Sequence, residues 1–416
     1  MEGNPGLLPA DVLLKIFSYC SYLDLVRFQF VCRWWQEVSR VKHLWRDIVY
    51  RPCWNDSPWR VIRNLNASPE LRALDLSEVK NRTVTKKLFM EIVNGCPNLE
   101  QLTVMWDCLY ETFHLKMNKI KILTINGYDN CVDLEYLHCY FPNVEHLDCR
   151  FSQIRESALE KYLRKKESPL HSVGFPCQTS GSACILPYLS MCTDLRSLTL
   201  RGTCKQAGCL PSQAVQHLKQ ILSLTLLEKG WPFVKDYLSL LTYFPNLMVL
   251  ELHKYSLHNR QVLLVVSETC PLLEKLTLCS TTCIRDQDLQ YVCNFKKLTF
   301  LCLRRSPYIT DACMAHIQAI LELRYLCISN CEQLTPQCLF SLCNFDKLQT
   351  LKFDLQNLDL PADLSNSCVK NPDLHILLYR CKDVNVLDCL RSQGFRVSLV
   401  KWLTGVEDCC GSHFVL

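Results

Sequence analysis

Cysteine and histidine are the residues of this sequence with the greatest capacity for chemistry, and it has 28 of the first and 11 of the second. Cys410 and His413 have the C-x-x-H spacing of half a zinc site, with Cys409 adjacent. Zinc requires about four ligands, and no second pair with suitable spacing lies near them. The histidines are dispersed, and none belongs to a recognisable pair of nucleophile and base. The 12 glycines form no phosphate-binding loop. We therefore expect no catalytic residue, no metal and no cofactor.

The spacing of the cysteines indicates a structural role for most of them. Cys279 and Cys283, and likewise Cys327 and Cys331, are separated by three residues within the repeated segments. A free thiol behaves as a small buried hydrophobe, which suits a stack of tight, similar layers. We expect reduced thiols that pack in a core.

Composition and charge narrow the class of protein. Asp11 and Lys15 interrupt the apolar positions at the N-terminus, so we expect no signal segment there. No segment approaches the ~20 uninterrupted apolar residues of a membrane helix. A net charge of +5 is small for 416 residues and the densest basic cluster, residues 164–166, is short, so nucleic-acid binding is not favoured. We expect a protein of the cytoplasm or nucleus that contacts no membrane.

An internal repeat organises most of the chain. The pattern L-x-x-L-x-L, with Ile, Val or Phe in place of some leucines, is clearest in LRSLTL, LMVLEL, LEKLTL, LTFLCL and LRYLCI. With weaker copies included, it starts at Leu71, Leu99, Ile120, Val144, Leu170, Leu195, Ile221, Leu247, Leu273, Leu298, Leu323, Leu348 and Leu374. From Val144 onward, each start follows the previous one by 25 or 26 residues. A period of this length is typical of stacked repeat proteins.

Each unit predicts a strand followed by a helix. The last four residues of L-x-x-L-x-L alternate, which suits a short strand with every second side chain buried. Two units then show apolar residues at helical spacing, namely Leu289, Val292 and Cys293 in one and Met314, Ile317 and Ile320 in the other. One unit cannot bury its apolar side alone, but stacked units bury a continuous core. We expect parallel strands on the inside of an arc and helices outside.

These units resemble the cysteine-containing class of leucine-rich repeats. The class has Cys or Asn shortly after the strand and an I-T-D-like tripeptide beyond it. The tripeptide is clearest at residues 309–311 and partial at residues 284–286. The resemblance implies an α/β leucine-rich-repeat solenoid.

Residues 1–50 do not follow the repeat. Three short segments have apolar residues at helical spacing: Leu13, Ile16, Phe17 and Cys20; Leu25 and Phe28; and Val31, Trp34, Trp35 and Val38. We expect Asp24 to cap the second helix. Three short helices bury little on their own, because a domain below ~40–60 residues usually needs outside help. So much apolar surface suggests a module that docks on a partner, although a plain helical cap on the first repeat is the alternative.

The same segment resembles the F-box. The resemblance rests on L-P-x-D-V-L-L-x-I-F-S-Y, then D-L, V-C-R-x-W and L-W; where the family usually has leucine, this chain has Cys20. It implies binding to a Skp-type adaptor, and through it to a cullin scaffold and a ubiquitin-loaded E2 enzyme. The side chains that the resemblance assigns to the adaptor are Leu8, Pro9, Leu13, Ile16, Phe17, Leu25, Val31, Trp35 and Trp45.

Together these patterns predict an all-α F-box at residues 1–50, a linker and N-terminal cap at 51–70, about thirteen leucine-rich repeats at 71–380, and a C-terminal cap and tail at 381–416. An F-box followed by leucine-rich repeats resembles the non-catalytic, substrate-recognition subunits of Skp–cullin–F-box ubiquitin ligases. The alternatives are a leucine-rich-repeat binding or inhibitor protein that acts without ubiquitin transfer, and an enzyme with a site in residues 380–416.

The target is expected on the concave face of the repeats. Strand positions that alternate with the leucines should point there, and they include Arg201, Glu251, His253, Lys275, Arg304, Arg305, Tyr325, Lys352 and Arg380. Because arginine binds carboxylate or phosphate with two parallel hydrogen bonds, this set favours an acidic or phosphorylated target. Solvated positions that serve only solubility are the alternative.

Overall fold

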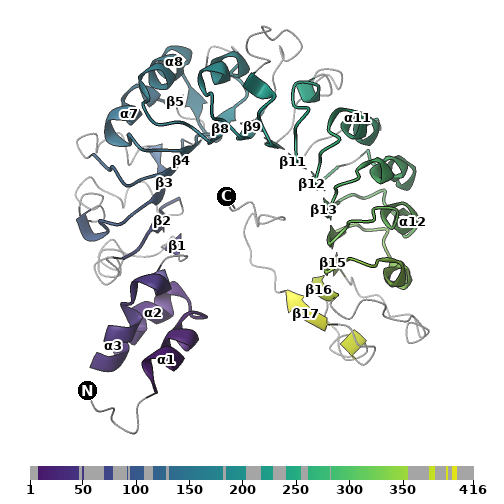
Figure 1. Cartoon of the computed structure of the whole chain (residues 1–416), viewed down its shortest axis with the longest axis horizontal. Helices are drawn as coiled ribbons and strands as arrows, with labels where there is room; N and C mark the ends of the chain where they lie inside the picture. The colour runs from purple at the N-terminus through teal and green to yellow at the C-terminus, as the bar shows by residue number, and fades with distance from the viewer. Residues whose placement is uncertain are drawn as a thin grey trace. The chain divides into compact units, whose positions relative to one another are not determined.

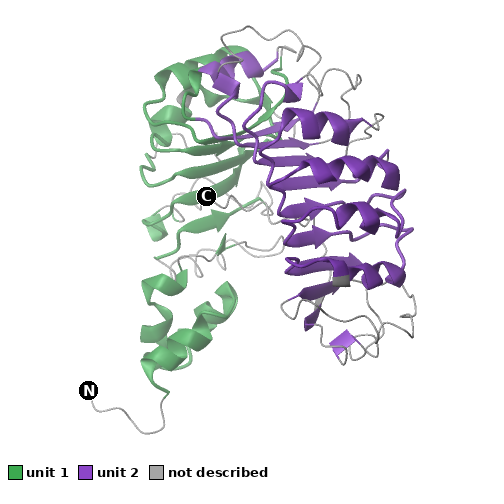
Figure 2. Cartoon of the chain, turned by 45° about the vertical axis from the view of Figure 1, so that its right-hand side comes forward, with its two compact units in different colours: residues 1–183, 191–194 green, residues 184–190, 195–416 purple. Residues whose placement is uncertain are grey.

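The computed structural model describes residues 8–45, 49–50, 70–77, 91, 94–106, 116–127, 131–180, 184–202, 217–227, 240–253, 261–281, 283–354, 374–379, 390–391 and 396–400. The chain divides into two compact units (Figure 2). The N-terminal unit comprises residues 1–183 and 191–194, and the C-terminal unit comprises residues 184–190 and 195–416.

The N-terminal unit begins with a helical module of α1 (Ala10–Phe17), α2 (Tyr22–Phe28), α3 (Arg33–Ser39) and the 3₁₀ helix η1 (Lys42–Trp45). Ser21, not Asp24, is the N-cap of α2, because its Oγ accepts the backbone N–H of Asp24 at 3.4 Å. The same hydroxyl donates to the Asp24 carboxylate at 2.6 Å and lowers the pKa of that carboxyl group. The expected N-cap therefore lies one helical turn after the observed one.

Aromatic side chains form the core of this module. The Phe17 ring stacks on Phe28 with centroids 4.5 Å apart and meets the edge of Trp35 at 5.3 Å. The Trp45 indole N–H donates to the Ser39 carbonyl at 2.8 Å, which satisfies the polar atom of a fully buried ring. The module therefore has a closed core of its own despite its small size.

A parallel sheet follows in the N-terminal unit, in the order β1 (Val49–Tyr50), β2 (Ala73–Asp75), β3 (Gln101–Met105), β4 (Ile122–Asn126), β6 (His146–Asp148) and β8 (Ser172–Pro176). Two short strands, β5 (Cys131–Val132) and β7 (Gln153–Ile154), pair separately. The helices are η2 (Leu134–Tyr136), α7 (Leu137–Tyr140) and α8 (Glu156–Lys165). In Figure 1, α7 and α8 lie on one side of these strands.

The C-terminal unit repeats this arrangement. Its strands run parallel in sequence order: β9 (Ser197–Arg201), β10 (Ser223–Leu227), β11 (Val249–His253), β12 (Lys275–Cys279), β13 (Phe300–Cys302), β14 (Tyr325–Cys327), β15 (Thr350–Asp354), β16 (His375–Tyr379) and β17 (Arg396–Val400). Its helices are α11 (Val262–Thr269), η5 (Asp286–Asn294), α12 (Cys313–Ile317) and η6 (Pro336–Asn344), with η3 (Leu186–Met191) before β9. In Figure 1, α11 and α12 lie on one side of the strands.

The alternation of leucines sets the register of the sheet. Leu198, Leu224 and Leu250 are register partners in consecutive strands and are fully buried, while the residues on either side of each are partly exposed. All thirteen strand positions predicted from the repeat carry a strand, which confirms the leucine-rich-repeat fold. β17 also continues the sheet within residues 381–416, where we expected a cap and tail, and Val397 on this strand is buried.

The helical half of the repeat differs in part from expectation. Met314, Ile317 and Ile320 are buried as predicted, and so are Leu289 and Val292. Cys293 is exposed, because η5 is a 3₁₀ helix with about three residues per turn, so positions i and i+3 share a face while i+4 turns away.

The I-T-D tripeptide links adjacent repeats. The backbone N–H and hydroxyl of Thr310 donate to the Asp286 carboxylate of the preceding repeat at 2.9 and 2.7 Å. One repeat later, Thr335 donates to Asp311 in the same way, at 2.8 and 2.5 Å. Each aspartate thus accepts two charge-assisted bonds from the start of the next helical segment.

Replacing Asp311 with alanine is expected to destabilise the protein by about 1.5–3 kcal/mol, because hydrogen bonds to a charged group are lost and partly buried donors remain unsatisfied. Denaturant unfolding measures the change. Asp346→Ala, which removes an exposed carboxylate, is the matched control. If Asp311→Ala and Thr335→Val have fully additive effects in a double-mutant cycle, the link contributes nothing.

The cysteines of the described residues are all free thiols. Cys279, Cys327 and Cys331 are buried, as expected, and Cys283 is half-buried. The Cys331 thiol donates to the Leu303 carbonyl of the preceding repeat at 3.1 Å. In the part of the chain that is described, no helix is long and apolar enough to span a membrane.

Candidate functional site

An apolar surface covers one side of α1 in the helical module. Val12, Ile16 and Tyr19 recur at i, i+4 and i+7 and are 40%, 44% and 77% exposed. Leu8 precedes the helix and is also exposed, and its carbonyl accepts the Trp34 indole N–H at 3.1 Å. This bond holds the entry of α1 against α3. The apolar stripe is thus presented on a fixed helix.

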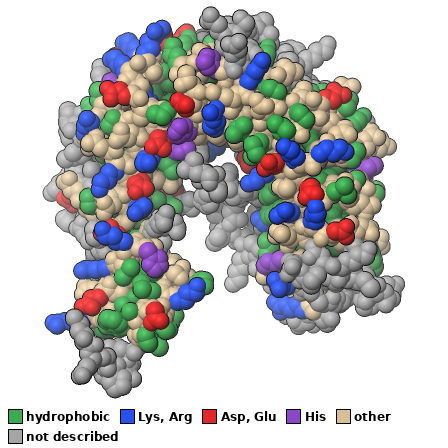
Figure 3. All heavy atoms as spheres, in the orientation of Figure 1, with side chains coloured by type: hydrophobic (Ala, Val, Ile, Leu, Met, Phe, Trp, Pro, Cys, Tyr) green, Lys and Arg blue, Asp and Glu red, His purple; other side chains and the backbone are tan. Residues whose placement is uncertain are grey.

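A second group of exposed apolar residues surrounds α2. Phe30 and Val31, in the turn between α2 and α3, are 63% and 59% exposed, and Leu23 on α2 is partly exposed. Figure 3 shows apolar side chains over this module. Because monomeric proteins rarely leave so many large apolar side chains uncovered on three short helices, this surface is the candidate interaction site of the module. We call the exposed set the module surface: Leu8, Val12, Ile16, Tyr19, Leu23, Phe30 and Val31.

The structure corrects part of the predicted adaptor set. Leu13, Phe17, Leu25 and Trp45 are at most 1% exposed, so they form the core of the module and present no surface to a partner. Trp35 is half-buried against Phe17 and Phe28. The other predicted positions, Leu8, Pro9, Ile16 and Val31, are exposed.

Four residues of the module surface were not predicted: Val12, Tyr19, Leu23 and Phe30. The signal in the sequence is that α1 is apolar on two sides. Leu13 and Phe17 fill one side, while Val12 and Ile16 lie on the other. A globular helix needs a single apolar stripe, so a second one indicates a partner.

The residues predicted to meet a target lie in the C-terminal unit. Side chains that alternate with the buried leucines point away from the helices and form what we call the strand face. Arg201, Glu251, His253, Lys275, Tyr325 and Lys352 occupy strand positions of this face. Arg380 lies outside the described residues.

Arg304 and Arg305 do not lie on a strand, contrary to expectation. β13 ends at Cys302, and the chain turns at Arg305, which has a φ of 58°. Ser280 and Asn330, the equivalent residues of the neighbouring repeats, have φ values of 59° and 57°. The turn thus recurs with the repeat, and it places Arg305 at the exposed edge of the strand face.

Two groupings on the strand face bring predicted residues together. The Glu251 carboxylate lies 3.4 Å from His253 Nε2 and accepts the Thr225 hydroxyl at 3.3 Å. The Lys352 ammonium lies 5.4 Å from the centre of the Tyr325 ring. Phe300, which the sequence analysis did not include, stacks on Tyr325 with centroids 4.2 Å apart. Its position in register with Lys275 and Tyr325 could have identified it.

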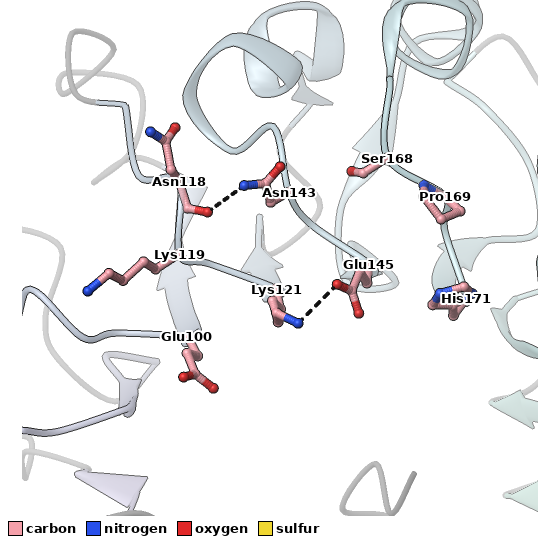
Figure 4. Close-up of a pocket in the computed structure, with 9 residues that line it drawn as sticks. All are labelled: Glu100, Asn118, Lys119, Lys121, Asn143, Glu145, Ser168, Pro169 and His171. Carbon is pink, nitrogen blue, oxygen red and sulfur yellow. Dashed lines mark hydrogen bonds and ion pairs between the residues drawn. The ribbon is translucent and has the colours of Figure 1, made fainter. Parts of the chain in front are cut away.

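A cavity of about 430 Å³ lies in the N-terminal unit, where the chain enters successive strands (Figure 4). The Lys121 ammonium pairs with Glu145 at 3.2 Å, and the Asn143 amide donates to the Asn118 carbonyl at 2.7 Å. These polar groups pair with one another across adjacent repeats. We therefore interpret the cavity as part of the contact between repeats rather than as a reaction centre.

In the described part of the chain, no three side chains of the metal-binding types come together. Cys409, Cys410 and His413 lie outside the described residues.

This chain is similar to known proteins over its N-terminal module and over much of its length. A family model described as F-box-like matches residues 6–51. F-box/LRR-repeat protein 12 of Bos taurus is 24% identical over 305 residues, which cover 64% of this chain and 93% of that protein. F-box/WD repeat-containing protein 5 of Homo sapiens is 42% identical over 50 residues, which cover 12% of this chain and 9% of that protein.

Solved structures with a similar course of the chain include that of the Rad7 and Elc1 complex in yeast, with a TM-score of 0.46 and 14% identity over 89% of this chain and 88% of that one. An internalin of Listeria monocytogenes gives a TM-score of 0.39 and 14% identity over 97% of this chain and 100% of that one. The repeat fold itself rests on the strand register and burial described above. This chain thus carries an F-box-like domain ahead of leucine-rich repeats, and over 305 residues it is similar to an F-box/LRR-repeat protein.

Proposed function

We propose that this chain is the substrate-recognition subunit of a Skp–cullin–F-box ubiquitin ligase. The observation that carries the proposal is the module surface: an F-box-like domain with a closed core leaves the seven large apolar side chains of this set exposed. They suit docking on a Skp-type adaptor, and the strand face suits capture of a target protein.

In this role the chain contributes position rather than chemistry. Ubiquitin transfer would be performed by an E2 enzyme on the cullin scaffold, and the receptor would raise the effective concentration of the target beside it. We propose the cytoplasm or the nucleus as the place of action.

Affinity purification tests the proposal. The tagged full chain, expressed in cells, should recover a Skp-type adaptor and a cullin, and the recovered complex should support ubiquitin transfer to co-purified proteins when E1, E2 and ubiquitin are added. Recovery of neither adaptor nor cullin would contradict it. The alternative, a repeat protein that sequesters its partner without ubiquitin transfer, predicts a stable partner and no adaptor; the module surface is the feature it leaves without a role.

We further propose that the target presents acidic or phosphorylated groups to the strand face. Lys275, Arg305 and Lys352 place positive charge on or beside this face, and Arg305 and Lys275 are exposed. Charge complementarity of this kind raises the rate of association and makes it sensitive to salt.

Replacing Arg304 and Arg305 together with glutamate is expected to weaken substrate capture about tenfold and to reduce its salt dependence, because attraction to an acidic target becomes repulsion. Lys296→Glu is the control, since its ammonium donates to the Cys293 carbonyl at the end of η5, on the helix side. Unchanged capture with adaptor binding intact would place the target elsewhere.

A further inference from the structure

An aromatic pair stands on the strand face of the C-terminal unit. Phe300 on β13 and Tyr325 on β14 are register partners, and their rings are parallel within 6° with centroids 4.2 Å apart. Both are half-exposed, and both pack on the buried thiols of Cys279, Cys302 and Cys327. The stack is therefore a supported platform that reaches the surface.

A lysine lies on each side of this platform. Lys275 on β12 is the register partner of Phe300 and is exposed. On the other side, the Lys352 ammonium lies 5.4 Å from the Tyr325 ring centre. Within the described ranges, neither lysine forms an ion pair with a carboxylate. Positive charge thus brackets an aromatic surface.

The stack presents the exposed edges of its two rings to a partner. Each ring covers one face of the other, and Lys352 lies over the outer face of Tyr325. The outer face of Phe300 is turned toward β12, because the two rings stack along the line that joins neighbouring strands. Because Lys275 stands on that side, an incoming aromatic ring can pack on the exposed edges of the two rings in an edge-to-face contact.

The spacing of the lysines sets the spacing of the groups they would bind. β12 and β15 are three strand steps apart, or roughly 14 Å at ~4.8 Å per step, and this is an upper limit for the two charges because the Lys352 ammonium reaches back over Tyr325 on β14. An extended peptide rises ~3.3 Å per residue, so about four residues cross that distance. We infer that the platform binds an extended acidic segment of the target, in which an aromatic side chain lies between two carboxylates about four residues apart. This inference rests on the proposed role as a substrate receptor and names the chemistry of the segment that is recognised.

A protein segment fits better than single-stranded nucleic acid. A base can also stack on an aromatic ring, but binding of single strands usually combines stacking with a continuous basic groove. On β11, next to Lys275, the strand face presents Val249 and the partly exposed carboxylate of Glu251, so basic charge does not continue in that direction.

The test uses a fluorescent peptide containing Asp-Ser-Trp-Ser-Asp between Gly-Ser flanks, added to the full chain purified with its adaptor. Fluorescence anisotropy is expected to show binding that weakens at least tenfold when both aspartates become asparagine or when tryptophan becomes serine. Phe300→Leu, which keeps apolar bulk but removes the ring, is expected to weaken binding roughly two- to tenfold. Lys296→Glu should bind as the unaltered chain does.

A charge exchange makes the test specific. Lys275→Glu with Lys352→Glu should lose the acidic peptide and bind the matching Lys-Ser-Trp-Ser-Lys peptide, which the unaltered chain should not bind. Equal binding of the Asp and Asn peptides, or no effect of Phe300→Leu, would overturn the inference. Tighter binding of labelled oligouridylate, weakened by the same variants, would overturn it in favour of nucleic acid. Adaptor recovery in the same preparations distinguishes the proposed receptor function from this inference. A chain that binds its adaptor but does not bind the peptide contradicts only the inference.

Discussion

A chain that carries Ile16→Asp and Val31→Asp is expected to lose the adaptor altogether in affinity purification, with binding at least ~100-fold weaker. Buried apolar anchors of an interface commonly contribute more than ~2 kcal/mol each, and a carboxylate in their place would have to be desolvated. Both side chains are exposed in the free chain, so the fold should be unaffected. Leu8→Ala with Pro9→Ala should act in the same direction.

Two further variants separate loss of the interface from loss of the fold. Val41→Asp replaces an exposed apolar residue outside the module surface and should leave adaptor binding intact. Phe17→Ala opens the core and should destabilise the module by about 3–5 kcal/mol, so it would lose the adaptor through unfolding. Adaptor binding by the double aspartate variant at the level of the unaltered chain would show that the partner docks elsewhere.

The second large effect is expected in thiol reactivity. Burial raises the pKa of Cys96 and of Cys192 to about 12. Cys32, Cys139 and Cys293 are exposed. The thiolate is the reactive form, so its population at pH 8 is on the order of a thousandfold smaller for a buried thiol of this kind than for an ordinary one. Alkylation by iodoacetamide should therefore be fast at the exposed thiols and slow at the buried ones.

Mass spectrometry of each cysteine over time provides the measurement. The exposed thiols should react first. The buried ones should react only as the repeats open, and denaturant should make all rates alike. Stoichiometric disulfides, or equal native rates for Cys96 and Cys293, would contradict the interpretation of the thiols as reduced core residues.

The strands could be predicted from the sequence because each must place its leucines in register with those of both neighbours. A pattern that recurs every 25 or 26 residues leaves one way to pair the strands, and the fold follows it. The helical segments are less constrained, since either a 3₁₀ or an α-helix can cover the leucines. That freedom explains why Cys293, which the helical spacing predicts on the buried face, is exposed.

The module surface could be predicted only in part. Ile16 and Phe17 are both large and apolar, and the sequence alone does not show which of them packs on Phe28 and Trp35 in the core of the module. The resemblance therefore identified the residues of the domain without separating its core from its surface. On the strand face, the limit was the length of β13: its end at Cys302 puts Arg304 and Arg305 in a turn, and no residue type at those positions indicates it.

The links between repeats have a consequence for how such a chain can change in evolution. Leu301 and Leu326 are register partners 25 residues apart, and each contact described here between repeats joins immediate neighbours. Deleting residues 301–325 would bring Leu326 into the place of Leu301 beside the same kinds of neighbours, whereas a deletion that is not a whole number of repeats would move the leucines out of register. Genetic gain or loss in whole units can therefore lengthen or shorten the strand face while the N-terminal module stays as it is.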